Sequence, residues 1–244
     1  MKIKKKIPRA SIAFVVAAIL VVTAGTALAA TLRPDIISED YKAEFDLDHI
    51  DVALVENGKE SKDIESKALL SELEGKVQPG RSYKEEIAAK NVSDTPEIVR
   101  MIITTYWHNT DDPEGDPDPK KDPGLIELTF NDDEYNKNAW QINDDETTSQ
   151  RRVFYLKEVL PGNTTSSPVV NKLRVNNKIL EDVEETTEQK GNQTIYTYTY
   201  AYDGYQICVE ADVQSVQTHN PQETIESTWG VRNVTVSGNK VTVK

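Results

Sequence analysis

Disulfide bonds within the chain are excluded, because the 244-residue sequence contains a single cysteine, Cys208. Among exported proteins, this favours a Gram-positive bacterial surface over the endoplasmic-reticulum route, whose products are commonly disulfide-bonded. The neighbours Ile207 and Val209 fall on the opposite face of a predicted strand. We therefore interpret Cys208 as a free, half-buried thiol rather than a catalytic nucleophile.

Histidine is also scarce, and the patterns that most hydrolases need are missing. The three histidines, His49, His108 and His219, are isolated in the sequence. A zinc-protease helix requires a His-Glu-x-x-His pattern, which is absent. The Gly-x-Ser-x-Gly turn of serine hydrolases and a glycine-rich phosphate loop are absent as well. The sequence therefore predicts a protein without enzymatic activity.

Basic residues are outnumbered, with 28 Lys and Arg against 41 Asp and Glu. Removing residues 1–29 takes away five basic and no acidic residues, so the formal net charge falls from −13 to −18. A surface this acidic repels nucleic acid and anionic lipid, and neither is an expected partner. Val, Ile, Tyr and Thr are well represented, which favours a folded β protein over a disordered acidic chain.

Only one hydrophobic run is long enough to cross a membrane, and it covers residues 10–30. Five basic residues precede it, and Ala27 and Ala29 give the small-x-small pattern that a signal peptidase cleaves, here before Ala30. We interpret residues 1–29 as a signal peptide and expect a secreted protein at the cell surface or in the matrix around it. The alternative is a retained anchor helix, so that the membrane would be contacted only through an uncleaved signal.

Short stretches of alternating apolar residues, separated by turn signals, fill residues 45–244. Residues 97–108 are apolar on both faces, which predicts a central strand. Asp203-Gly204 predicts a hairpin between 195–201 and 205–216. Asn220-Pro221 predicts the start of a short helix, and Gly230 predicts its end. The pattern predicts one all-β domain, a two-sheet jelly-roll-like β-sandwich with one short helix near the C-terminus.

An Asp/Pro/Gly-rich loop between residues 111 and 123 is the one cluster with the character of a site. Hard carboxylate oxygens at short spacing suit Ca²⁺, although the spacing is not that of an EF-hand. The alternative is a charged, solvated loop stiffened by proline. If Ca²⁺ binds, its candidate ligands are Asp111, Asp112, Asp116 and Asp118. No other cofactor is expected.

Four tyrosines alternate along one predicted strand: Tyr196, Tyr198, Tyr200 and Tyr202. They allow three interpretations: packing into the sandwich core, stacking at a contact between subunits, or a platform for carbohydrate. Thr197 and Thr199 lie on the other face, so the segment is uncharged and strongly β-prone. It is therefore a candidate element for self-association.

Several stretches resemble, in matching order, the TasA/camelysin family of exported Gram-positive proteins. The most specific of them lies near the C-terminus and consists of residues 209–220, 223–225 and 229–231. Weaker landmarks are residues 52–58, Pro79-Gly80, Asn91 with 99–102, and 154–156 followed by 160–165. Together they span nearly the whole chain.

The resemblance implies a jelly-roll subunit of extracellular fibres in a biofilm matrix, exported through a dedicated signal peptidase. It also implies assembly by donor-strand exchange, in which the N-terminal segment of one subunit completes the sheet of the next. The donor here would be residues 30–44, with Leu32, Ile36, Ile37 and Tyr41 as its apolar side chains. The expected partner is the chain itself or a homologous subunit. The alternatives are a camelysin-like surface metalloprotease and a monomeric adhesin or carbohydrate-binding sandwich.

Overall fold

The computed structural model describes residues 51–60, 70, 77–112, 115–130 and 138–244. Contacts divide the chain into Met1–Leu47 and Asp48–Lys244, and every described residue belongs to the second unit. The predicted signal peptide and the predicted donor segment therefore lie outside the described residues. In the part that the structure describes, no helix is long and apolar enough to cross a membrane.

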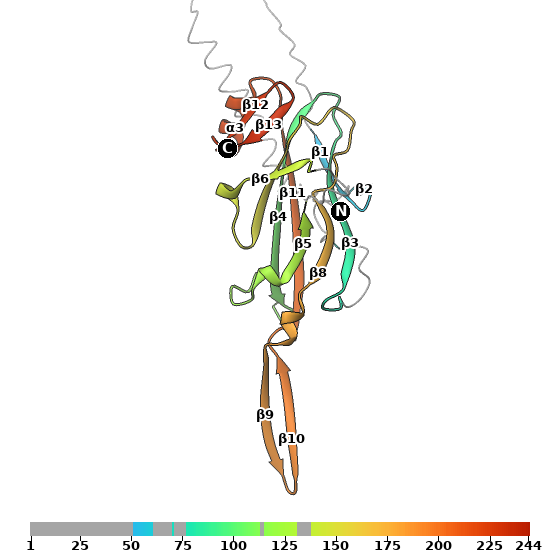
Figure 1. Cartoon of the computed structure of the whole chain (residues 1–244), viewed down its shortest axis with the longest axis vertical. Coiled ribbons are helices and arrows are strands. Elements are labelled where there is room, and N and C mark those ends of the chain that lie inside the picture. The colour runs from blue at the N-terminus through green and yellow to red at the C-terminus, as the bar shows by residue number, and fades with distance from the viewer. Residues whose placement is uncertain (1–50, 61–69, 71–76, 113–114, 131–137) are drawn as a thin grey trace, which may run out of the picture. The chain divides into compact units, whose positions relative to one another are not determined.

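The first sheet contains five antiparallel strands (Figure 1). In spatial order these are β2 (Lys59–Glu60), β1 (Val52–Glu56), β3 (Ser82–Asn91), β8 (Val170–Val175) and β5 (Ile126–Phe130). Asn57 and Gly58 connect β1 to β2 with φ angles of 49° and 81°. A two-residue loop with positive φ at both positions matches the right-handed twist of the strands that it joins.

The second sheet contains four strands, and β4 lies inside it as predicted. The spatial order is β11 (Tyr205–Gln217), β4 (Glu97–Asn109), β7 (Arg151–Leu156) and β6 (Trp140–Ile142). All thirteen residues of β11 pair with β4 without a register shift. The first part of β4 is buried on both faces, which explains why its sequence is apolar at nearly every position.

The two sheets pack face to face and bury the main core between them. Its members come from both sheets, and the largest fully buried apolar side chains among them are Trp140, Ile87, Met101, Ile103, Ile126 and Leu173. Burying side chains of this kind is worth roughly 1.5–3 kcal/mol each and is the main force that holds the sheets together. The prediction of an all-β sandwich is confirmed, and a jelly-roll connectivity stays a prediction.

A second, smaller core covers the outer face of the four-stranded sheet. It forms where α3 (Pro221–Trp229) and the hairpin of β12 (Val234–Ser237) and β13 (Lys240–Val243) pack against β4, β7 and β11. The helix begins and ends as predicted: Pro221 is its first residue, and Gly230 has a φ of 71°. The amide of Gly230 donates to the carbonyl of Glu226 at 2.9 Å and closes the last turn. Asn220 precedes the helix in a left-handed conformation, and its side chain makes no capping bond.

The prediction of a hairpin between 195–201 and 205–216 is wrong. β10 (Gln193–Tyr200) pairs with β9 (Val183–Lys190) across Gly191-Asn192, and β11 pairs with β4. Gly191 has a φ of 67°, which suits the first position of a two-residue turn. Gly191-Asn192 and Asp203-Gly204 are both good turn signals. Burial decides which strands pair, because the pairing of β11 with β4 places Val209 in the core. In Figure 1 the β9–β10 hairpin extends away from the two sheets.

Three short 3-10 helices complete the described elements. They are η1 (Pro123–Leu125), η2 (Asp144–Glu146) and η3 (Asn177–Leu180). The first of them begins with a capping bond, in which the amide of Gly124 donates to Asp122 Oδ1 at 2.8 Å.

Candidate functional site

Strand β11 has a single partner among the described residues. It pairs with β4 along its whole length, and its other edge is hydrogen-bonded to no described strand, although β1 of the other sheet lies close to it. The alternate residues that point toward the main core are only partly buried at four positions: Tyr205, Ile207, Ala211 and Val213. An edge that no described strand pairs, above half-buried apolar side chains, is a surface on which a further strand can pair.

A cavity of about 620 Å³ opens where β11 begins. Its walls come from both sheets and from η3, and polar and apolar groups contribute to them about equally; the apolar and aromatic side chains include Trp107, Val175, Ile179, Tyr202, Tyr205 and Ile207. The described side chains around this end of the seam between the sheets therefore do not fill it. The cavity continues the line of half-buried residues under the β11 edge.

Tyr202 belongs to this seam rather than to the tyrosine row of β10. Its ring contacts that of Trp107, with 4.8 Å between ring centres, and its hydroxyl accepts the amide of Asp122 at 3.2 Å. The ammonium group of Lys121 lies 4.8 Å from the centre of the Tyr202 ring and 4.4 Å from that of Tyr205. A cation held between two aromatic faces fixes the turn that joins β10 to β11.

The other three tyrosines are exposed on the hairpin. The exposed fractions of Tyr196, Tyr198 and Tyr200 are 57, 56 and 44 %. Of the three interpretations of the tyrosine row, packing into the core is wrong for these residues. The contact between subunits and the carbohydrate platform stay predictions.

The predicted calcium ligands do not converge in the described part of the loop. Asp118 Oδ1 accepts the amide of Lys120 at 2.8 Å, and its Oδ2 accepts the hydroxyl of Tyr205 at 2.8 Å. The bond from Lys120 is the main reason why the pKa of Asp118 lies below its usual value. Asp112 Oδ2 accepts the amide of Asp116 at 3.2 Å, while the amide of Asp111 donates to Asn109 Oδ1 at 2.9 Å.

Other candidate chemical groups are dispersed as well. His108 lies at the end of β4 with its Nε2 3.2 Å from Gln206 Oε1, and His219 is exposed after β11. His49 lies outside the described residues. Where the chain is described, no three His, Cys, Asp or Glu side chains gather in a group that could hold a metal ion.

Cys208 is a free, half-buried thiol on β11, as predicted. Burial is the main cause that raises its pKa, and the neighbouring Glu210 adds to the effect. A thiol with a raised pKa carries little thiolate at neutral pH and is therefore a poor nucleophile. This agrees with a structural role for the residue.

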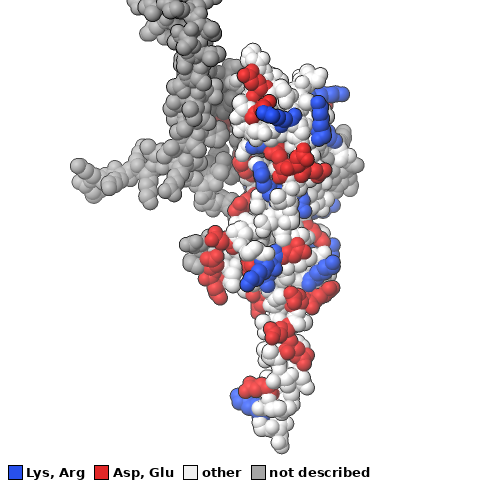
Figure 2. Space-filling model, turned by 90° about the vertical axis from the view of Figure 1, so that its left-hand side faces the viewer, with Lys and Arg blue, Asp and Glu red and all other residues white. Residues whose placement is uncertain are grey.

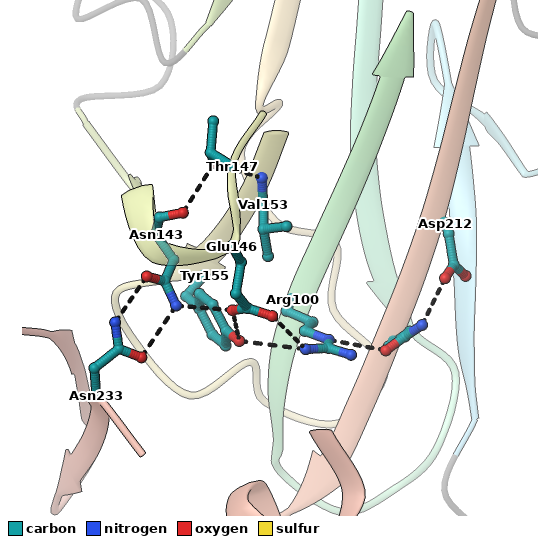
Figure 3. Close-up of polar contacts among 9 residues, drawn as sticks. Arg100, Asn143, Glu146, Thr147, Val153, Tyr155, Asp212 and Asn233 are labelled. Carbon is teal, nitrogen blue, oxygen red and sulfur yellow. Dashed lines mark hydrogen bonds and ion pairs between the residues drawn. The ribbon is translucent and has the colours of Figure 1, made fainter. Parts of the chain in front are cut away.

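A buried polar network in the outer layer was not foreseen from the sequence. Arg100 on β4 donates from Nη1 to Glu146 Oε1 at 3.1 Å and from Nε to Gln214 Oε1 at 2.8 Å (Figure 3). Tyr155 donates its hydroxyl to Glu146 Oε2 at 2.6 Å. The network ties η2 to three neighbouring strands of one sheet. An arginine inside the apolar run of β4 was the one signal for it, because a buried guanidinium requires a partner.

The same network continues toward the C-terminal hairpin. Asn143 donates to Glu146 Oε2 at 2.7 Å, and Asn233 donates to Asn143 Oδ1 at 2.8 Å and to Asp145 Oδ2 at 2.8 Å. These bonds hold η2 against Asn233, which directly precedes β12 (Figure 3). The groups satisfy one another within the protein, and the network fastens the outer layer to the sheet.

The candidate site is thus the edge of β11 that no described strand pairs, with the cavity beside it, together with the β9–β10 hairpin. Acidic and basic side chains are interspersed over the sheets, and the hairpin shows acidic residues among many uncharged ones (Figure 2). No family model matches the chain, and the search of curated proteins found no significant match.

Proposed function

We propose that this protein is a secreted structural protein of a Gram-positive cell surface or biofilm matrix. It associates with itself or with a homologous subunit by strand addition, as a fibre-forming or accessory subunit. Its β11 edge accepts a strand from a neighbouring subunit.

One observation carries the proposal, namely the state of the β11 edge. Thirteen residues of this strand pair with β4 on one side, and no described strand is hydrogen-bonded to it on the other. Beneath the edge, Ile207, Ala211 and Val213 are only partly buried. An added strand pairs with the backbone groups and covers these side chains, so both affinity and register come from the same surface.

The proposed donor is the segment of residues 30–44, which carries Leu32, Ile36, Ile37 and Tyr41. It follows the predicted signal peptide directly, so cleavage before Ala30 releases it from the membrane. The resemblance to the TasA/camelysin family supports this assignment, because donor-strand exchange by an N-terminal segment is the mode of assembly that the resemblance implies.

Deleting the donor tests the proposal. The full-length gene, with and without codons 30–44, is expressed in a secreting Gram-positive host, and the recovered proteins are compared by negative-stain electron microscopy. We expect filaments from the complete chain and a folded, β-rich monomer from the deletion variant. Filaments that survive the deletion refute the donor assignment.

A matched pair of substitutions separates apolar docking from a general effect of charge. Ile36→Asp places a carboxylate at a proposed docking position, whereas Thr31→Asp places the same charge at a polar position that precedes all the proposed docking residues. We expect Ile36→Asp to abolish filaments and Thr31→Asp to leave them. Equal loss in both variants contradicts docking of Ile36. Chelator-sensitive cleavage of casein by the pure protein, together with stoichiometric zinc, would replace the structural function by a metalloprotease.

A further inference from the structure

The β9–β10 hairpin is a two-stranded ribbon with no packing partner among the described residues. All sixteen residues of its strands are exposed, and its sheet contains these two strands alone. A two-stranded ribbon is at best marginally stable in water, and a third strand or a packed face is what stabilises it. Both edges and both faces of the hairpin are therefore accessible to another molecule.

The two edges of the ribbon differ in charge. β9 carries Glu184, Glu185 and Glu188 against the single basic residue Lys190, whereas β10 carries no charged residue from Gln193 to Tyr200. Pairing β9 with β9 of another copy would bring glutamates close to glutamates, which destabilises a sheet. β10 lacks the charged side chains that usually protect an exposed edge from pairing. Its Ile, Tyr and Thr residues are strong strand formers.

The geometry of antiparallel pairing fixes which residues would meet. Along β10, only every second residue has backbone groups that point out of the ribbon. When two copies pair, each of these residues therefore lies opposite one of the same kind, so that even-numbered residues face even-numbered residues. Directly paired residues also share a face. Two β10 strands joined in this way place Tyr196, Tyr198 and Tyr200 of both copies on one face. Tyrosines in adjacent strands then stack, and they lose part of the exposure that they have in the single chain.

We propose that β10 pairs antiparallel with β10 of a second copy and forms a four-stranded sheet of two hairpins. The contact is two-fold, because the same surface is used on both sides. It is separate from the β11 edge and does not depend on the donor segment. A chain with both contacts would be linked to neighbours at two places, so that filaments formed by strand addition would be cross-linked to one another.

Cysteine cross-linking tests the contact, in the full-length chain expressed in a secreting host and with Cys208 replaced by serine. Single cysteines are placed on β10 at Ile195, Thr197 or Thr199. The matched controls are cysteines at the residues paired with them on β9, Glu188, Thr186 and Glu184. Each control lies on the same face of the same exposed ribbon and differs only in the strand that carries it.

We expect oxidation to give disulfide-linked dimers from at least one β10 variant, at least tenfold above the paired β9 variant. Tyr196→Glu, added to that β10 variant, should abolish the cross-link, while Thr187→Glu at the paired position on β9 should leave it. Equal cross-linking from both strands overturns the proposal, as does its absence. If cross-links are absent and the protein is retained on insoluble cellulose in a way that Tyr198→Ala removes, the tyrosine row is a carbohydrate platform.

The same cross-linking in the variant that lacks residues 30–44 separates this contact from the proposed function. Dimers that persist without the donor show that the hairpin contact is independent of strand addition. Dimers that disappear with the donor overturn the hairpin contact as a separate interface. The outcome for filaments is read independently by microscopy.

Discussion

The guanidinium group of Arg100 lies over the indole ring of Trp229, with 4.5 Å between its central carbon and the ring centre. Arg100 belongs to the four-stranded sheet, and Trp229 is the last residue of α3. This contact therefore joins the outer layer to the sheet. It also closes the polar network around Glu146, whose side chain is 17 % exposed, while that of Arg100 is 9 % exposed.

Replacing Arg100 by methionine should destabilise the protein by about 3 kcal/mol or more, because Glu146 is left without its buried counter-charge. The measurement is urea unfolding followed by Trp fluorescence at neutral pH. The control is Arg232→Ala, which breaks an ion pair with Glu226 whose side chains are 83 and 45 % exposed. That change should stay within about 0.5 kcal/mol. Similar losses in the two variants would contradict the role of the buried network.

Tyr155 should make the protein sensitive to alkali. Burial, reinforced by the hydrogen bond to Glu146, raises the pKa of its phenol to about 12, whereas an unfolded tyrosine titrates near about 10. The stabilisation is complete below the unfolded pKa and is lost as the pH rises through the folded one. The slope between these values is at most about 1.4 kcal/mol per pH unit.

The test for Tyr155 compares the wild type with Tyr155→Phe by urea unfolding across this alkaline range. The phenylalanine variant is less stable at neutral pH, because Glu146 loses a hydrogen bond. We expect the difference between the two proteins to shrink as the pH rises. A difference that stays constant would show that the pKa of Tyr155 is the same in the folded and the unfolded protein.

Gly162 is required for space rather than for backbone freedom. A methyl group at this position would overlap the backbone carbonyls of Ser93 and Asp94. Gly162→Ala should therefore destabilise the protein by about 1–3 kcal/mol, measured as a shift of the thermal midpoint. Gly124→Ala is the control, because its added methyl group would meet chiefly the side chain of Asp122, which can move. An equal shift in both variants would argue against a backbone clash at Gly162.

Cys208 should react slowly with thiol reagents in the folded protein. Its pKa is raised, chiefly by burial, and the thiolate is the reactive form. Labelling with a chromogenic disulfide at mildly alkaline pH should be slow in buffer and fast in denaturant, by a factor of about ten or more. Equal rates in the two conditions would place the thiol in free solvent.

The sandwich could be predicted from the sequence because the strands are marked by local patterns. β4 is apolar on both faces, and it lies between two partner strands and two cores, as β7 does. α3 was predicted from Asn220-Pro221 and Gly230 for the same reason, since its boundary signals are local. What each strand pairs with is not local, and this is where the prediction around Asp203-Gly204 was wrong.

The candidate site was less accessible from the sequence, because exposure depends on the neighbours of a strand. Tyr200 and Tyr202 are two residues apart and look equivalent in the sequence. The strand ends between them, so Tyr200 is exposed and Tyr202 packs on Trp107. Arg100 was overlooked because its partners Glu146 and Gln214 are 46 and 114 residues away. The predicted donor, residues 30–44, lies outside the described residues.

The unbroken register between β4 and β11 has a mechanical consequence. A force that slides the two strands past each other loads all thirteen registered pairs at once, whereas a force that peels them apart loads one pair at a time. Shear along the strands must therefore overcome many backbone bonds together. The ribbon of β4 and β11 is the part of the described fold best suited to carry tension along its length.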